Sequence, residues 1–176
     1  MNILIIDNGT KHLRKLKEQI SESDYSVADF SEIDLNEVQK YDAIILSGGH
    51  DFPVMGNESR LQKEIEIIRQ FQKPVLGICL GFEIIARTFS ATLEPLDQKD
   101  KGIIEIKILG TDKIFQGIEN LKVFESHRWA VRAIPSELIA LAKSDHCIEA
   151  IRHKFKPIYG VQFHPEMFEG GIVPIS

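Results

Sequence analysis

The chain has 176 residues, 43% of them hydrophobic and 27% charged, and its net charge is −5 at pH 7. These values are typical of one globular domain spanning residues 1–176, and the acidic balance argues against a nucleic-acid partner. Two cysteines, Cys79 and Cys147, make no disulfide framework, and no apolar run reaches the roughly 18 residues of a membrane span. We therefore expect a cytoplasmic protein without membrane contact. The cysteine and histidine spacings predict no metal site.

The first half of the chain alternates between buried strands and amphipathic helices. Apolar runs without alternation predict strands, and apolar residues at helical spacing predict helices. The strands are predicted at residues 2–7, 25–30, 43–46 and directly after Lys73, and the helices at 11–20 and 60–72. Asp34 or Asn36 is expected to cap a brief additional helix. This order predicts an α/β domain with a flavodoxin-like, doubly wound parallel sheet.

The second half has a different pattern of short β candidates separated by turn residues. They are residues 102–109, 121–124, 129–134, 138–142, 147–152 and 158–163. No linker separates them from the first half. We therefore expect a small antiparallel extension of the same sheet, without a second domain.

A short stretch around Cys79 predicts a nucleophile. An apolar strand runs from Lys73 into Gly77, Cys79 and Gly81, and helical spacing follows. Strand, nucleophile between glycines, then helix is the pattern of the nucleophile elbow, where a sharp turn leaves no room for neighbouring Cβ atoms. The helix N-terminus is expected to favour thiolate. The alternative for the short motif alone is a buried cysteine before a glycine-rich turn.

A cysteine nucleophile needs a base and donors for the developing oxyanion. His164 and Glu166 follow the last predicted strand, and a spacing of two places both side chains on one face of an extended segment. Backbone N–H groups of Leu80 and of the Gly48–Gly49 loop are candidate oxyanion donors. Because sites in open α/β sheets form at the carboxyl ends of strands, these features and Asn8–Gly9 are expected to converge.

Residues 77–81 and 160–166 together resemble the class I (triad) glutamine amidotransferases. Further segments are most similar to the stand-alone glutaminase subunit of archaeal-type GMP synthase: residues 5–9, 45–49, 123–127 and 148–150. The resemblance implies that Cys79 attacks the γ-carboxamide of glutamine to form a thioester, that His164 relays protons and that Glu166 holds His164. It also implies an oxyanion hole of Gly49 and Leu80. The glutamine pocket would be lined by Glu83 and the Ser126–Trp129 segment.

The resemblance further implies a partner. Ammonia would pass to a separate synthetase subunit, an ATP pyrophosphatase that aminates XMP. The chain itself has no Walker-type phosphate loop, so any ATP-using step is expected to lie on another polypeptide. No cofactor is expected here.

Several positions depart from the family pattern. Glu83 stands where the family usually has glutamine. A glutamate at this position resembles the γ-glutamyl hydrolases, so a stand-alone γ-glutamyl hydrolase is one alternative. A non-catalytic amidotransferase-like regulatory domain is another. The loop after Gly49 reads His50-Asp51-Phe52-Pro53, and residues 8–12 replace the glycine-glutamine-tyrosine ending that is usual in the synthase subunit. Only 10 residues follow Glu166, where relatives usually continue into a closing helix, and the glycines and proline of residues 170–174 are expected to form one poorly.

Overall fold

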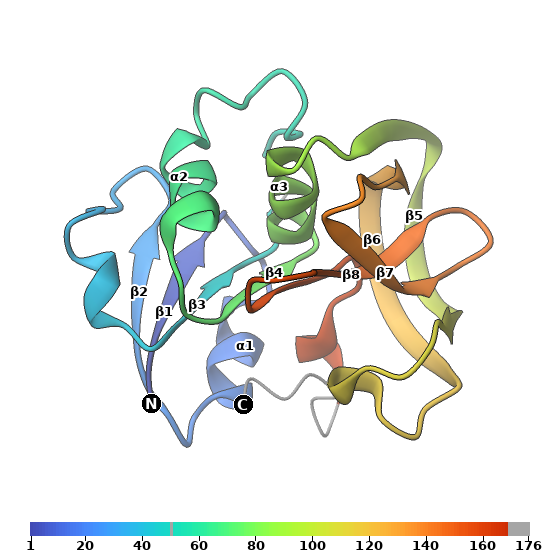
Figure 1. The fold of residues 1–176 in the computed structure, drawn as a ribbon, viewed down its shortest axis with the longest axis horizontal. Coiled ribbons are helices and arrows are strands. Elements are labelled where there is room, and N and C mark those ends of the chain that lie inside the picture. Colours follow the sequence, from blue (N-terminus) through green and yellow to red (C-terminus); the bar gives the residue numbers. More distant parts are fainter. Residues whose placement is uncertain (50, 169–176) are drawn as a thin grey trace.

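A computed structural model describes residues 1–49 and 51–168, which form a mixed α/β fold (Figure 1). In this part of the chain, one nine-stranded sheet has the order β2-β1-β3-β4-β9-β8-β6-β5-β7. The strands are β1 (Asn2–Asp7), β2 (Asp24–Asp29), β3 (Ala43–Leu46), β4 (Val75–Ile78), β5 (Thr92–Ile108), β6 (Asn120–Ala133), β7 (Leu138–Lys143), β8 (Ile148–His153) and β9 (Ile158–Val161). The helices are α1 (Leu13–Gln19), α2 (Gln62–Gln70) and α3 (Leu80–Thr88).

Five neighbouring strands, from β2 to β9 in the sheet order, pair in parallel. Helix α1 lies on one face of these strands, and α2 and α3 lie on the other (Figure 1). Successive β1 side chains alternate between the two faces: Ile5 packs in the same cluster as Leu16 of α1, and Ile6 packs with Ile68 of α2. Both faces are therefore covered, which is why the predicted strands lack polar alternation.

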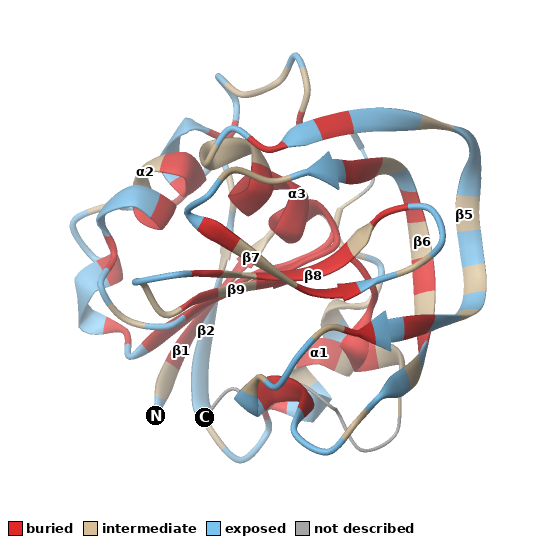
Figure 2. Ribbon diagram, turned by 45° about the vertical axis from the view of Figure 1, so that its right-hand side comes forward, coloured by how far each residue is buried: buried red, intermediate tan, exposed pale blue. Residues whose placement is uncertain are grey.

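The antiparallel part is larger than the sequence suggested. Strand β5 begins at Thr92, ten residues before the predicted start, and β6 is one strand where two were predicted. The polar run from Glu125 to Arg128 breaks the apolar pattern of β6, but β5 pairs with Glu125, Ser126 and His127, and pairing resumes at Trp129 after a register shift opposite Arg128. Figure 2 shows the long β5–β6 ladder with exposed residues along β5. Exposed residues at the edge of a sheet give little hydrophobic signal, so the early part of β5 was missed.

The predicted brief helix is a single 3-10 turn at Val38–Lys40, and its N-cap residue, Glu37, makes no side-chain cap bond. Asp34 instead accepts a hydrogen bond from the Asn36 N–H at 2.9 Å, which makes a local turn. The predicted capping role of Asp34 or Asn36 is therefore wrong. None of the helices in the described ranges is long and apolar enough to cross a membrane.

A buried carboxyl group joins the end of β1 to α2. Glu64 is fully buried, and the Asn8 side-chain amide donates to its Oε1 at 2.9 Å. Burial raises the pKa of Glu64 to about 7. Since this pKa lies above the unfolded value, the stability associated with protonated Glu64 is complete below about pH 4.5 and is lost as the pH rises through 7.

Glu64→Gln is expected to stabilise the protein at alkaline pH. The amide keeps an acceptor for Asn8 and removes the buried charge, so the gain should be near zero at pH 4.5 and about 3 kcal/mol at pH 8.5. Urea unfolding at the two pH values measures the difference. Glu66→Gln, at a partly exposed position of the same helix, is the control. An equal effect of Glu64→Gln at both pH values would contradict the raised pKa.

Candidate active site

Cys79 occupies a sharp turn between β4 and α3. Its backbone has φ 50° and ψ −103°, a conformation that costs free energy for a residue with a side chain and that is found at functional sites. The flanking glycines make the turn possible. A Cβ atom on Gly77 would lie 2.5 Å from the Gly81 backbone, and one on Gly81 would lie 2.3 Å from the Leu46 carbonyl oxygen. The geometry is that of the elbow expected from the sequence.

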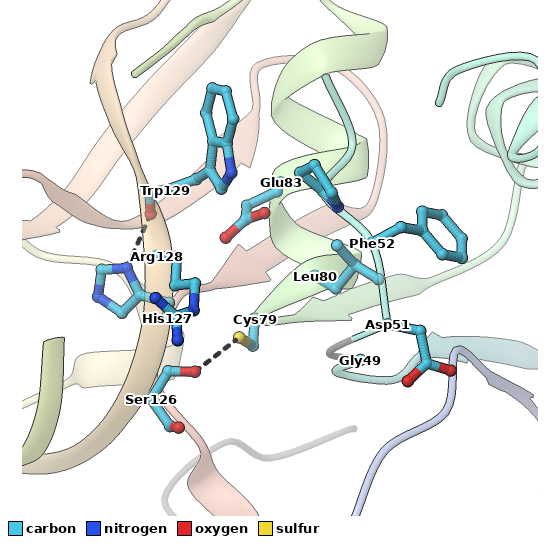
Figure 3. Close-up of a pocket in the computed structure, with 11 residues that line it drawn as sticks. Gly49, Asp51, Phe52, Cys79, Leu80, Glu83, Ser126, His127, Arg128 and Trp129 are labelled. Atoms are coloured by element: carbon cyan, nitrogen blue, oxygen red, sulfur yellow. Dashed lines mark hydrogen bonds between the residues drawn. The ribbon is translucent and has the colours of Figure 1, made fainter. Parts of the chain in front are cut away.

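The sulfur of Cys79 is buried and weakly hydrogen-bonded. The Gln162 side-chain amide donates to Sγ at 3.8 Å, and Sγ lies 3.8 Å from the Ser126 carbonyl oxygen (Figure 3). Burial raises the pKa of the Cys79 thiol well above its usual value, and the carboxyl groups of Glu83 and Glu166 raise it further. The Leu80 N–H at the start of α3 lowers the pKa of Cys79, as expected for a helix N-terminus, but the effect of burial is larger. The thiol proton must leave when sulfur attacks.

His164 and Glu166 are brought together, although not on a strand as expected. His164 Nδ1 lies 2.8 Å from Glu166 Oε1, and both side chains are buried. Strand β9 ends at Val161, and Glu166 lies in a 3-10 turn over Pro165–Met167. Proline suits the first position of such a turn because its φ is fixed. Pro165 therefore begins the turn in which the Glu166 carboxylate lies against the His164 imidazole.

The nucleophile and the candidate base meet beside Gly48. A Cβ atom there would lie 3.1 Å from His164 Cε1 and 3.5 Å from the Cβ of Cys79. Gly49 packs just as closely: its Cβ would be 2.2 Å from the Asn8 carbonyl oxygen and 2.8 Å from Leu80 Cδ2. The loop after β3 therefore approaches the elbow as closely as backbone can, which brings Gly49 and Leu80 together.

A pocket opens beside Cys79 (Figure 3). Its lining includes the three predicted substrate residues, Glu83, Ser126 and Trp129. It also includes the rest of the predicted Ser126–Trp129 segment, His127 and Arg128, and three residues for which the sequence predicted no pocket role: Asp51, Phe52 and Pro53. The closeness of these three in sequence to the Ser47–Gly49 loop was the available signal. Acids and a cation in one pocket suit a zwitterionic amino-acid ligand.

Glu83 is linked to the nucleophile through Gln162, another residue that the sequence did not single out. The Gln162 amide donates to Glu83 Oε1 at 3.2 Å as well as to the Cys79 sulfur. Glu83 is buried, and burial raises its pKa to about 7. Near neutral pH a substantial fraction of Glu83 is therefore a neutral acid, with the donor capacity of the glutamine usual at this position.

A second opening lies on the His164 side of the nucleophile. It is lined by Thr10, Lys11, His12, Gly49, Lys99, Ser126 and His164. The rings of His12 and His164 are 5.1 Å apart between centroids, in an edge arrangement. Burial and the neighbouring His164 lower the pKa of His12. His50 and the residues after 168, where the sequence departs from the family pattern, lie outside the described residues.

A family model, glutamine amidotransferase class-I, matches residues 4–171. The chain belongs to the class I glutamine amidotransferases. The resemblance seen in the sequence is thereby confirmed.

Curated relatives are similar over nearly the whole chain. The glutamine-hydrolyzing GMP synthase subunit of Pyrococcus furiosus is 34% identical over 170 residues, which covers 94% of this chain and 89% of the relative. The corresponding protein of Thermococcus kodakarensis has the same identity and coverage.

Solved structures agree on the fold. A Thermoplasma acidophilum protein provisionally assigned to GMP synthase is 28% identical, with a TM-score of 0.86 over 94% of this chain and 84% of that chain. A glutamine amidotransferase of Thermotoga maritima is 20% identical with a TM-score of 0.77, covering 94% of this chain and 76% of that chain. At that identity, the second match supports the fold alone.

Proposed function

We propose that this chain is a cytoplasmic, single-domain glutaminase that hydrolyses glutamine with Cys79, His164 and Glu166. The observation that carries the proposal is the strained Cys79 elbow facing a pocket, with the hydrogen-bonded His164–Glu166 pair beside it. The parallel strand order β2-β1-β3-β4-β9 supports the inference that this half of the sheet is flavodoxin-like, with its site at the carboxyl ends of the strands.

The proposed reaction begins with transfer of the Cys79 proton to His164 as sulfur attacks the carboxamide carbon of glutamine. The Gly49 and Leu80 N–H groups stabilise the negative oxygen of the tetrahedral intermediate. The carbon–nitrogen bond then breaks, and His164 gives its proton to the departing ammonia. His164 next takes a proton from water, which attacks the thioester. Glutamate leaves, and the proton returns to sulfur. Glu166 orients the imidazole and stabilises its charge throughout.

The pocket residues fit this substrate. The Gln162 amide contacts both the sulfur and Glu83. In the pocket, Glu83 lies near Cys79, and Trp129 and Phe52 supply apolar walls (Figure 3). Arg128 places a permanent positive charge in the same pocket as Asp51 and Glu83, which suits an amino acid carrying both charges.

We further infer that the ammonia passes to a separate ATP pyrophosphatase protein that aminates XMP. Relatives that are 34% identical over 94% of the chain are named as the glutamine-hydrolyzing component of GMP synthase, which supports this assignment. The opening beside His12 lies next to His164, where ammonia is released in the proposed reaction.

The test is ammonia release from glutamine by the purified chain, alone and with an ATP pyrophosphatase partner plus XMP and ATP. We expect release to rise when the partner and its substrates are present, with one GMP formed for each glutamine consumed. Glutamine hydrolysis that the partner leaves unchanged would contradict the coupling while leaving the glutaminase assignment intact. The absence of hydrolysis under both conditions would contradict both.

Glu83 favours one second candidate, a γ-glutamyl hydrolase that needs no partner, because a buried acid replaces the family's usual glutamine next to the nucleophile. Such an enzyme would release amino acids from γ-glutamyl peptides when the chain is assayed alone. A rate on these peptides above that on glutamine with the partner would favour this candidate over the coupled amidotransferase.

Glu83→Gln is expected to raise kcat/KM for glutamine by about 3- to 10-fold, or about 0.7–1.4 kcal/mol in barrier. The amide removes an acid that raises the pKa of Cys79, and it keeps an acceptor for Gln162. Steady-state ammonia release at pH 8 measures the change, with exposed Glu32→Gln as the control. Unchanged kinetics would make Glu83 a structural residue.

A further inference from the structure

We propose that a second site, outside the Cys79 machinery, binds one divalent transition-metal cation of the zinc type. The site is a buried group of four side chains, here called the β6–β8 cluster: Glu125 and His127 of β6, Cys147 just before β8, and Glu149 of β8. All four are buried, with exposed fractions of 0% for Glu125 and Glu149, 3% for His127 and 8% for Cys147. One nitrogen, one sulfur and two carboxylates form a donor set that zinc prefers.

Three of the four donor groups are close enough to share one ion, and Glu125 lies beside them. The ligand atoms of His127, Cys147 and Glu149 all lie within 4.8 Å of one another. His127 Nε2 is 3.1 Å from Glu125 Oε2, and Cys147 Sγ is 3.0 Å from Glu149 Oε1. Metal–ligand bonds of about 2.0–2.3 Å in a tetrahedron place donor atoms roughly 3.3–3.8 Å apart, so small side-chain shifts would complete the site.

The second layer of the cluster already has the arrangement that supports a metal ligand. His127 Nδ1 lies 2.7 Å from the Trp129 carbonyl oxygen, and a carbonyl only accepts, so Nδ1 carries a hydrogen (Figure 3). The lone pair of a neutral His127 is then on Nε2, the atom facing the carboxylates. The Ser144 hydroxyl donates to Glu149 Oε1 at 2.6 Å. Backbone support of the histidine and a hydroxyl donor to the carboxylate are the usual outer contacts of metal sites.

Two buried oxygens point to a missing positive charge. Glu125 Oε1 and Glu149 Oε2 are fully buried without a hydrogen-bond partner among the described residues, and the closeness of the two carboxyl groups adds to burial in raising the pKa of Glu149 to about 8. Burying carboxylates without a partner is costly, and a cation would satisfy both. Asp100 of β5 is paired in register with His127 and can add an oxygen ligand, since its carboxylate lies within 4.8 Å of the ligand atoms of Glu125 and His127. On binding, the Cys147 proton is released to solvent and a thiolate–metal bond forms.

The location gives the ion a role in shaping the pocket. Strands β6 and β8 are joined by the single residue pair Val131–Ile148, and the cluster would link them a second time. His127 also borders the pocket, between Ser126 and Arg128. Spacing along the sequence predicted no metal site because the ligands come from segments far apart in the chain: Cys147 follows Glu125 by 22 positions and Glu149 follows it by 24.

Cobalt is the probe that identifies the ligands. In Cys79→Ser protein, Cys147 is the only cysteine of the chain, so a thiolate-to-cobalt charge-transfer band on adding Co²⁺ assigns Cys147 directly. We expect this band to saturate at one Co²⁺ per chain. Zn²⁺ should displace the cobalt, and it should raise the melting temperature of the full-length protein by several degrees, with EDTA reversing the rise.

Matched variants separate the cluster from surface binding. Cys147→Ser should abolish the band, and Glu149→Gln should weaken Co²⁺ binding at least 10-fold. His146→Ala, which removes the exposed histidine next to Cys147, should leave the band and the stoichiometry unchanged. Absence of the band in folded Cys79→Ser protein would overturn the proposal, as would its loss in His146→Ala. A proton shared between Glu125 and Glu149 would then be what the cluster holds.

Discussion

Replacing Cys79 with alanine is expected to abolish glutamine hydrolysis, with kcat falling by at least about 10⁴-fold. No other described side chain occupies the elbow, and the thioester cannot form without sulfur. Cys79→Ser should leave little activity, because an alcohol beside the same base is far harder to deprotonate. Ammonia release in the presence of the synthetase partner measures both variants.

Two observations keep this test decisive. Glutamine should still bind to Cys79→Ala with near-native affinity, which calorimetry can show, because most of the pocket lining is unchanged. A glutamine-mimicking electrophile should label the native chain at Cys79, and this would exclude the non-catalytic regulatory domain. Full activity in Cys79→Ala would show that the nucleophile has been wrongly assigned.

Glu166→Gln is expected to lower kcat by about 10²- to 10⁴-fold with little change in KM. The carboxylate accepts from His164 Nδ1 at 2.8 Å, so it fixes the tautomer and stabilises the imidazolium formed when Cys79 loses its proton. This support matters because burial raises the pKa of the Cys79 thiol, so His164 must take up the proton and a full charge during attack. An amide keeps the shape and loses the charge.

The division between rate and binding is the decisive readout for Glu166. A higher KM with unchanged kcat would place Glu166 in substrate binding and contradict its proposed role. Circular dichroism checks that the substitution, which lies in the 3-10 turn at Pro165–Met167, has not unfolded the protein. Glu119→Gln, at an exposed position before β6, should leave both constants unchanged.

The sequence alone determined much of this protein, because the determining signals are local. Apolar runs identified the parallel strands, and glycines two residues either side of Cys79 indicated a turn that only glycine can flank. The closeness of His164 and Glu166 was predicted from a spacing of two. That result survived although the geometry is a proline-directed 3-10 turn, since a short spacing limits how far apart the two side chains can lie.

Only the tertiary structure decided the pKa shifts in the site and the contacts between residues that are far apart in the sequence. Burial, which no local pattern reports, raises the pKa of Cys79 and brings that of Glu83 to about 7. The continuity of β6 depends on pairing with a distant strand, as does the meeting of His127 with Cys147 and Glu149. Desolvation and contacts between distant segments arise when the sheet closes, so they are properties of the folded chain.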